Sequence, residues 1–310
     1  MSLKKMGLLA IAGILIVAGA LIVFRDHVIG TKNAQAELAD LGSLYEATEE
    51  IAAAKEQFQK GIEPAEIMTK DEKPHVALVI DGLPDRTTTA RLLDVLKKHG
   101  ASAVFFVEGQ NAANQPETIK LIREAGQEIG NYTFVGIAAA QELPQERLLA
   151  EICRTQRVVE VLAVTKPKFF RAPRTVYDEE LLRALRAAGV ECAVKESAHY
   201  APGWLKDEAG AAAYAATVPA GSIIAIDIAV PVEAPAQDVA VEDARPAVDK
   251  QPTVEDKPAG ERKAAPVDAA DELDWLLTAL ESTGKMPGNI HEFRRIHYVP
   301  AAPSAAVQGK

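Results

Sequence analysis

Short apolar runs that resemble strands alternate with helix-like segments from residue 74 to residue 228. The helix-like segments carry apolar residues at intervals of three and four, which places these residues on one face. The predicted strands cover residues 76–80, 103–107, 128–131, 168–170, 190–194 and 222–228, and the predicted helices cover 86–99, 116–125, 143–161 and 178–188. Strands that alternate with helices at this spacing favour a parallel sheet, either open or closed into a barrel. The sequence therefore predicts an α/β domain.

The alternation stops at residues 230–270. This segment holds six of the 18 prolines, no Leu, Ile or aromatic residue, and a local charge of −4. Such a composition buries too little apolar surface to offset the entropy of ordering the chain, so we predict a disordered acidic, Pro/Ala-rich insertion in a surface loop. The fold is expected to resume with a helix over 271–283 and a short strand over 289–293, and the tail 300–310 is expected to be disordered.

The N-terminus has the pattern of a membrane anchor. Residues 7–24 contain no charged residue, and a helix of this length spans roughly 27 Å, close to the ~30 Å core of a bilayer. Lys4 and Lys5 precede the apolar run, as in a signal anchor or a signal peptide. Cleavage after residues 34–36 is the alternative to an uncleaved anchor over 1–32. The short N-terminal tail favours a globular body outside the cytoplasm, in a single-pass protein of the cell membrane.

Residues 33–73 are predicted to form a helical stalk and linker. Leu38, Leu41, Ile51 and Phe58 recur at helical spacing, and Gly61 and Pro64 follow them as helix breakers. Two interpretations of this thin apolar stripe stay open. It is either a solvated stalk or a short coiled coil that supports a weak dimer.

Composition excludes several classes of protein. The net charge of −10 and the pI near 5.2 argue against a nucleic-acid partner, because phosphate binding needs a basic face. Two cysteines cannot build a framework of several disulfides. Cys153 falls in a predicted helix and Cys192 in a predicted strand, so we expect two buried free thiols. The first strand is not followed by the glycine pattern of a dinucleotide-binding loop.

Three segments of the body resemble one family. Residues 101–134 (ASAVFFVEGQNAANQPETIKLIREAGQEIGNYTF), 169–173 (FFRAP) and 221–227 (GSIIAID) resemble the polysaccharide deacetylase (NodB-type) domain. The resemblance implies a distorted (β/α) barrel with its site at the C-terminal ends of the strands. On this basis the domain covers residues 74–299, interrupted by the insertion 230–270.

The resemblance also implies a metal-dependent reaction, but this chain lacks the residues that would bind the metal. The family hydrolyses N- or O-acetyl groups of sugar polymers with a divalent metal such as zinc, held by one Asp and two His. Those ligand positions are occupied by Gly82, Tyr132 and Gly136, while Asp81 falls at the position of the base and Asp227 at that of the acid. An alignment with a one-residue gap would instead make Asp81 a surviving ligand. Catalytic zinc usually takes three protein ligands, so we expect no metal cofactor and impaired catalysis.

Arg171 persists at the position of the residue that holds the family base. A buried Asp81–Arg171 pair is compatible with a purely structural role and with a catalytic or ligand-contacting one. Asp227 is a candidate second carboxylate for a rebuilt acid/base site. The family's fourth motif aligns weakly with Glu196, His199 and Tyr200.

Four residues are candidates for contact with a sugar, and these are Tyr132, Pro173, Tyr200 and Trp204. Trp204 lies in a Pro-Gly turn, where covering the core is an equally good interpretation.

Three functions follow from the sequence. The first is a cell-envelope protein with impaired catalysis that binds a cell-wall glycan, or a protein partner, in the former active-site groove. The second is an active de-N-acetylase for a peptidoglycan- or chitin-like polymer, or another hydrolase, with a rearranged site. The third is a structural spacer of the envelope.

Overall fold

The structure is a computed structural model that describes residues 46–228, 232 and 268–299. The predicted anchor, the first part of the stalk, most of the insertion and the tail lie outside these residues. Within the described residues, we find no helix with the length and apolar character needed to cross a bilayer.

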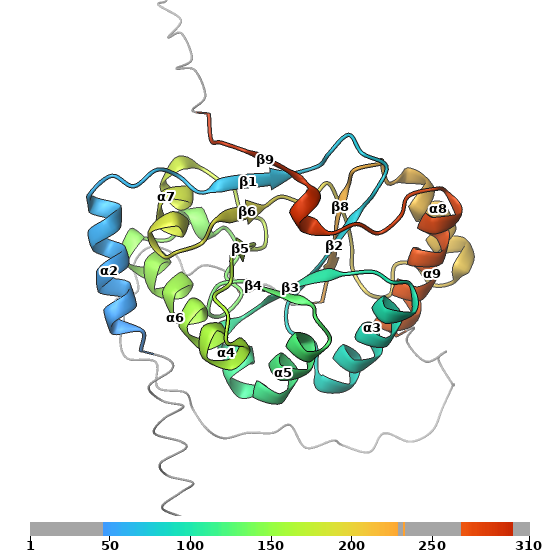
Figure 1. Cartoon of the computed structure of the whole chain (residues 1–310), viewed down its shortest axis with the longest axis horizontal. Helices are drawn as coiled ribbons and strands as arrows, with labels where there is room; N and C mark the ends of the chain where they lie inside the picture. Colours follow the sequence, from blue (N-terminus) through green and yellow to red (C-terminus); the bar gives the residue numbers. More distant parts are fainter. Residues whose placement is uncertain (1–45, 229–231, 233–267, 300–310) are drawn as a thin grey trace, which may run out of the picture. The chain divides into compact units, whose positions relative to one another are not determined.

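The described chain is organised around one curved sheet of nine strands (Figure 1). The strand order is β7-β8-β2-β3-β4-β5-β6-β1-β9, and every neighbouring pair is parallel except β1 and β9. The strands are β1 Glu66–Thr69, β2 Ala77–Asp81, β3 Ala103–Val107, β4 Glu128–Asn131, β5 Phe169–Phe170, β6 Cys192–Val194, β7 Ala198–Tyr200, β8 Ile223–Asp227 and β9 Arg294–Ile296. Because β7 and β9 do not pair with each other, the architecture is an α/β half-barrel.

Helices cover the outer face of the sheet (Figure 1). They are α2 Thr48–Gln59, α3 Arg86–Lys98, α4 Gly109–Asn114, α5 Pro116–Glu124, α6 Gln145–Ala163, α7 Glu179–Ala187, α8 Glu208–Thr217 and α9 Ala269–Ser282. The inner face carries an apolar cluster that includes Val79, Phe106, Phe169 and Ala225. Both faces of the central strands are therefore buried, which explains why β2 and β3 read as unbroken apolar runs in the sequence.

Most predicted elements are found, with some differences in detail. The structure adds β1, β7, α4 and α8. The last strand, expected over 289–293, lies instead at Arg294–Ile296, directly after a single 3₁₀ turn at Ile290–Glu292. Cys153 on α6 and Cys192 on β6 are buried and free, as predicted, and burial raises the pKa of each thiol to about 12.

Helix α2 differs from the predicted stalk. It packs against α6 and α7, with Ala54 buried at 1% exposure. Ile51 and Phe58, two members of the apolar stripe assigned to a stalk or coiled coil, pack against the core beneath α6 and α7. The guanidinium of Arg183 covers the Phe58 ring at 5.1 Å. These side chains are occupied within the domain, so this part of the stripe is not free for a dimer. Since β1 follows in the sheet, residues 48–69 belong to the domain.

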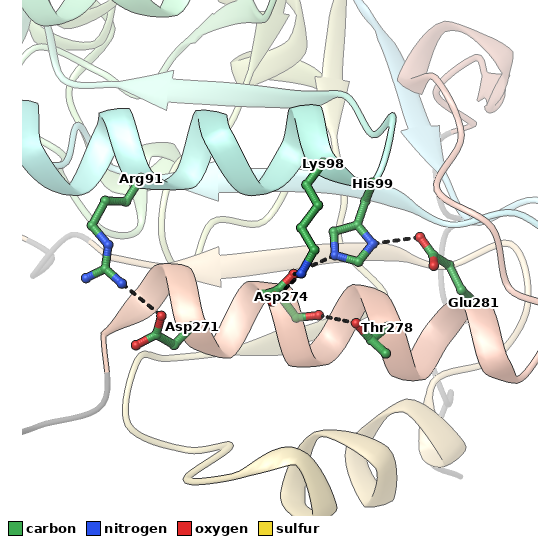
Figure 2. Close-up of polar contacts among 7 residues, drawn as sticks. All are labelled: Arg91, Lys98, His99, Asp271, Asp274, Thr278 and Glu281. Atoms are coloured by element: carbon green, nitrogen blue, oxygen red, sulfur yellow. Dashed lines mark hydrogen bonds and ion pairs between the residues drawn. The ribbon is translucent and has the colours of Figure 1, made fainter.

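Helix α9 brings the chain back to the domain after the insertion. Figure 2 shows that its polar face meets the polar face of α3. The Arg91 guanidinium binds Asp271 at 2.8 Å, and Lys98 Nζ binds Asp274 at 2.7 Å. The His99 ring lies between two carboxylates, with Nε2 2.6 Å from Asp274 and Nδ1 2.8 Å from Glu281. Five charged side chains therefore fix the register between two helices that are distant in the sequence.

The packing of α2 leads to a stability prediction. Ala54→Lys should lower the free energy of unfolding by about 2 kcal/mol or more, because the buried site has no room for the side chain and no partner for its charge. The matched control is Ala53→Lys, at the exposed neighbouring position, which should stay within about 0.5 kcal/mol. Urea denaturation of the full chain measures both. Equal effects of the two substitutions would restore the solvated-stalk interpretation.

Candidate functional site

The inner face of the half-barrel ends in a row of polar side chains. Side chains alternate along a strand, so the residue two positions beyond each inward apolar residue also points inward. This relation carries Val79 to Asp81, Phe106 to Glu108, Val194 to Glu196 and Ala225 to Asp227. The same row includes Tyr132, which belongs to the inner cluster, and Arg171, which is two residues beyond the inward Phe169. Parallel strands place all of these residues at one end of the barrel, where ligands bind in folds of this kind.

Asp81 and Arg171 form a buried ion pair across the interior. Arg171 Nε donates to Asp81 Oδ1 at 2.8 Å, and Nη2 donates to Oδ2 at 2.7 Å. The two side chains are 2% and 4% exposed. Burial raises the pKa of the Asp81 carboxyl, while the Arg171 guanidinium acts in the opposite direction. Burial lowers the pKa of Arg171, but the Asp81 carboxylate raises it overall, so the guanidinium stays protonated.

The second side of the guanidinium is also occupied. Arg171 Nη1 donates to Glu196 at 2.6 Å and to the Val194 carbonyl at 3.2 Å. Although burial acts to raise it, the Arg171 charge holds the pKa of Glu196 below its ordinary value. The Tyr177 hydroxyl donates to the same Val194 carbonyl at 3.1 Å. Each of the three guanidinium nitrogens of Arg171 therefore donates to another residue of the domain, which favours the structural interpretation of the Asp81–Arg171 pair.

Asp227 lies beside Asp81. The two residues are register partners at the ends of the neighbouring parallel strands β8 and β2. Burial, followed by the charge of Asp81, raises the pKa of Asp227 to about 6. Among the described residues, no guanidinium or ammonium group is bonded to Asp227. Its carboxyl therefore has no cationic partner, whereas that of Asp81 is paired with Arg171. His199, the register partner of Ala225, lies on the same face of the sheet and acts on Asp227 through its charge.

The positions that hold the family metal do not fit a metal ion here. Gly82 has φ +93° and Gly136 has φ +74°, and neither has a donor side chain. Burial raises the pKa of the Tyr132 phenol far above its ordinary value, so the phenolate that a metal would need is disfavoured. A Cβ atom at Gly136 would lie 3.3 Å from Cγ of Glu108. Among the described residues, no group of three His, Cys, Asp or Glu side chains has a geometry suited to a metal.

Glu108 is a site residue that the sequence interpretation missed. It is 6% exposed, and its Oε2 accepts a hydrogen bond from the Leu83 backbone N–H at 2.9 Å. The carboxylate thus ties the end of β3 to the loop after β2, beside Gly136. Its place two residues after the inward Phe106 was available from the sequence as a signal. Tyr177 was also missed, because it lies in a loop whose path the sequence does not show.

The structure corrects two of the predicted sugar contacts. Tyr200 is 0% exposed and points away from the site, because its register partner is Ile226 and its ring packs against Tyr214. Its ring is therefore not available to stack on a sugar. Pro173 is buried, and its carbonyl accepts from the Ala139 N–H at 2.9 Å, so it shapes a loop. Tyr132 is only 3% exposed, whereas Trp204 is 57% exposed.

Comparisons with known proteins find a matching family model and similar sequences. Residues 69–193 match a family model described as polysaccharide deacetylase. A peptidoglycan-N-acetylglucosamine deacetylase from Bacillus cereus is 36% identical over 116 residues, which cover 37% of this chain and 41% of the relative. The peptidoglycan-N-acetylmuramic acid deacetylase PdaC from Bacillus subtilis is 30% identical over 118 residues, covering 38% of this chain and 25% of the relative. The chain thus spans less than half the length of these two relatives.

Solved structures show the same fold. A CE4 family pseudoenzyme from Bacillus anthracis gives a TM-score of 0.53 at 19% identity, covering 75% of this chain and 70% of that one. A family 4 carbohydrate esterase from Streptomyces lividans, in complex with acetate, gives 0.51 at 18% identity, covering 72% and 97%. At these identities the likeness concerns the fold alone.

The ion pair leads to a double-mutant prediction. Arg171→Met should lower the free energy of unfolding by about 3–5 kcal/mol, because Asp81 is left buried without its partner. The double variant Asp81→Asn/Arg171→Met should return to within about 1–2 kcal/mol of the wild type. Lys55→Met, at an ion pair whose side chains are 36% and 80% exposed, is the control and should cost less than about 1 kcal/mol. Urea denaturation measures all three. A double variant no more stable than Arg171→Met would contradict the proposed pairing.

Asp227 leads to a pH prediction. The pKa of Asp227 is about 6 in the folded protein, above its ordinary value, so folding favours the protonated carboxyl. The contribution of this carboxyl to the free energy of unfolding is therefore lost as pH rises through 6. Asp227→Asn should therefore raise the free energy of unfolding by about 1–2 kcal/mol at pH 7.5, a range that allows for solvent screening of the half-buried group. The gain should vanish near pH 4. Denaturation of both proteins from pH 4 to 8 tests this, and a gain that is the same at both ends would refute it.

Proposed function

We propose that this polysaccharide deacetylase-type domain, shown by the family match over residues 69–193, binds a cell-wall glycan without hydrolysing it through a metal. One observation carries the proposal. The three positions that would hold the metal are Gly82, Tyr132 and Gly136, and the described side chains around them provide no substitute set. The fold of such a domain is retained, while the residues that would hold a metal able to polarise an acetyl carbonyl are absent from the family's ligand positions.

The ligand class is proposed from the relatives. Peptidoglycan deacetylases from Bacillus cereus and Bacillus subtilis match the chain at 30–36% identity. A shared scaffold alone does not fix function. The choice of a glycan as ligand therefore rests on this similarity together with the row of polar side chains at the C-terminal ends of the strands, which we call the barrel mouth. Carboxylates such as Asp227 and Glu196 accept hydrogen bonds from sugar hydroxyl groups.

A second candidate function is hydrolysis by a rebuilt site. Asp227 and Asp81 lie side by side, and the pKa of Asp227 is raised to about 6, which suits a proton donor near neutral pH. However, both oxygens of Asp81 are bonded to Arg171, so only one of the two carboxyl groups is free to act. This arrangement favours binding over catalysis.

The cellular setting is part of the proposal. The uncharged run at residues 7–24 supports a single-pass anchor in the cell membrane, with the domain on the extracytoplasmic side where a cell-wall glycan is accessible. A spacer role for the insertion 230–270 is compatible with this setting. Membrane fractionation followed by protease treatment of intact cells would test the placement.

The function is tested by measuring binding, metal content and acetate release together. The full chain in detergent should bind chitooligosaccharide or purified peptidoglycan, contain no stoichiometric divalent ion after incubation with zinc, and release no acetate. Isothermal titration, elemental analysis and an acetate assay provide the three measurements, with a metal-dependent peptidoglycan deacetylase as the positive control. One bound divalent ion per chain together with acetate release would overturn the proposal in favour of an active hydrolase.

A further inference from the structure

The loop between β7 and α8 presents one exposed aromatic side chain on a tight turn. Trp204 N–H donates to the Ala201 carbonyl at 3.1 Å, with Pro202 and Gly203 between them and φ +95° at the glycine. This is the pattern of a type II turn, which accepts Pro at its second position and requires a positive φ at its third. Trp204 is 57% exposed while the next residue, Leu205, is 3% exposed. The turn therefore exposes the indole to solvent, while the adjacent Leu205 is anchored in the core.

A buried carboxylate holds the backbone on both sides of this tryptophan. Glu272, in the first turn of α9, is 0% exposed. Its Oε1 accepts from the Gly203 N–H, and its Oε2 accepts from the Leu205 N–H at 3.1 Å. Together with the turn hydrogen bond, three consecutive amides are fixed. Charge-assisted hydrogen bonds of this kind are stronger than neutral ones, so the backbone of the turn is held firmly.

The tryptophan is located at the edge of the candidate site. Its ring centroid is 5.6 Å from that of His199, at an interplanar angle of 56°. His199 lies on the inward face of β7, and its register partner Ala225 is two residues before Asp227 on β8. The two rings therefore border the barrel mouth on the side of Asp227. Among the described residues, the exposed large apolar side chains include a single aromatic one, which is Trp204.

We propose that Trp204 and His199 form a stacking platform for a pyranose ring, and that Glu272 is the residue that positions this platform. This inference rests on the proposed glycan-binding function and adds the residues that hold one ring of the glycan, with the C–H face of the sugar on the indole. A large exposed aromatic ring provides contact area, and a fixed backbone reduces the entropy lost on binding. The Asp227 carboxyl beside the platform accepts hydrogen bonds from the sugar hydroxyl groups.

The positioning role is tested by fluorescence. The chain has two tryptophans, so Trp275→Phe leaves Trp204 as the sole emitter. In this background Glu272→Gln should increase acrylamide quenching of Trp204 and lower its anisotropy, because the amide group of Gln turns an N–H donor toward one of the two backbone donors. Glu281→Gln, on the same helix but bonded to His99, is the matched control and should change neither quantity. Urea denaturation of each variant establishes that it is folded.

Binding of chitooligosaccharide by the same full-length proteins tests the platform. Trp204→Ala, which removes an exposed side chain, should raise Kd about tenfold, and Glu272→Gln about three- to fivefold. If the wild type binds and Trp204→Ala binds equally well, the platform is overturned while the proposed function stands. If the wild type does not bind, the proposed function fails, and with it the sugar as ligand. Unchanged quenching in Glu272→Gln overturns the positioning role, whatever the binding result.

Discussion

The Asp81–Arg171 ion pair is the interaction around which the candidate site is arranged. β2 and β5 are separated in the sheet by β3 and β4, so the pair reaches across the interior instead of along the sheet. Each partner compensates the burial of the other, and the remaining guanidinium donor binds Glu196 and the Val194 carbonyl on β6. A buried charge left without its partner costs several kcal/mol, so exchanging one residue of this pair alone should destabilise the domain. The geometry of the barrel mouth therefore depends on the pair even if it takes no part in chemistry.

The positions aligned with the family's metal ligands differ in backbone conformation as well as in side chain. Gly82 and Gly136 both have positive φ angles. Residues other than glycine adopt such angles only with backbone strain. Glu108 fills the space beside Gly136, and Val232 pairs with the backbone of the same loop through hydrogen bonds at 3.0 and 2.9 Å. The backbone at these two loop positions is therefore suited to glycine. Acidic side chains make up much of the polar row, and a single arginine partly balances their charge.

Sequence reasoning predicted the parallel α/β body, because its strands are buried on both faces and its helices have clear apolar faces. It also brought Asp81, Arg171 and Asp227 to one end of the sheet through the family resemblance. It failed for α2, because an amphipathic helix gives the same pattern whether its apolar stripe meets a partner helix or its own domain. It failed for Tyr200, because the register of the short strand β7 decides which of two adjacent side chains faces the site, and a shift of one residue reverses the answer.

Helix α9 contacts both helix α3 and the turn that presents Trp204. It is the first described element after residues 233–267, and it carries two separate sets of acidic residues. Asp271, Asp274 and Glu281 bind the basic face of α3, while the buried Glu272 binds the turn that presents Trp204. Glu272 and Asp274 lie on the same helix, so the contacts with α3 and the contacts with the turn both hold α9 in place.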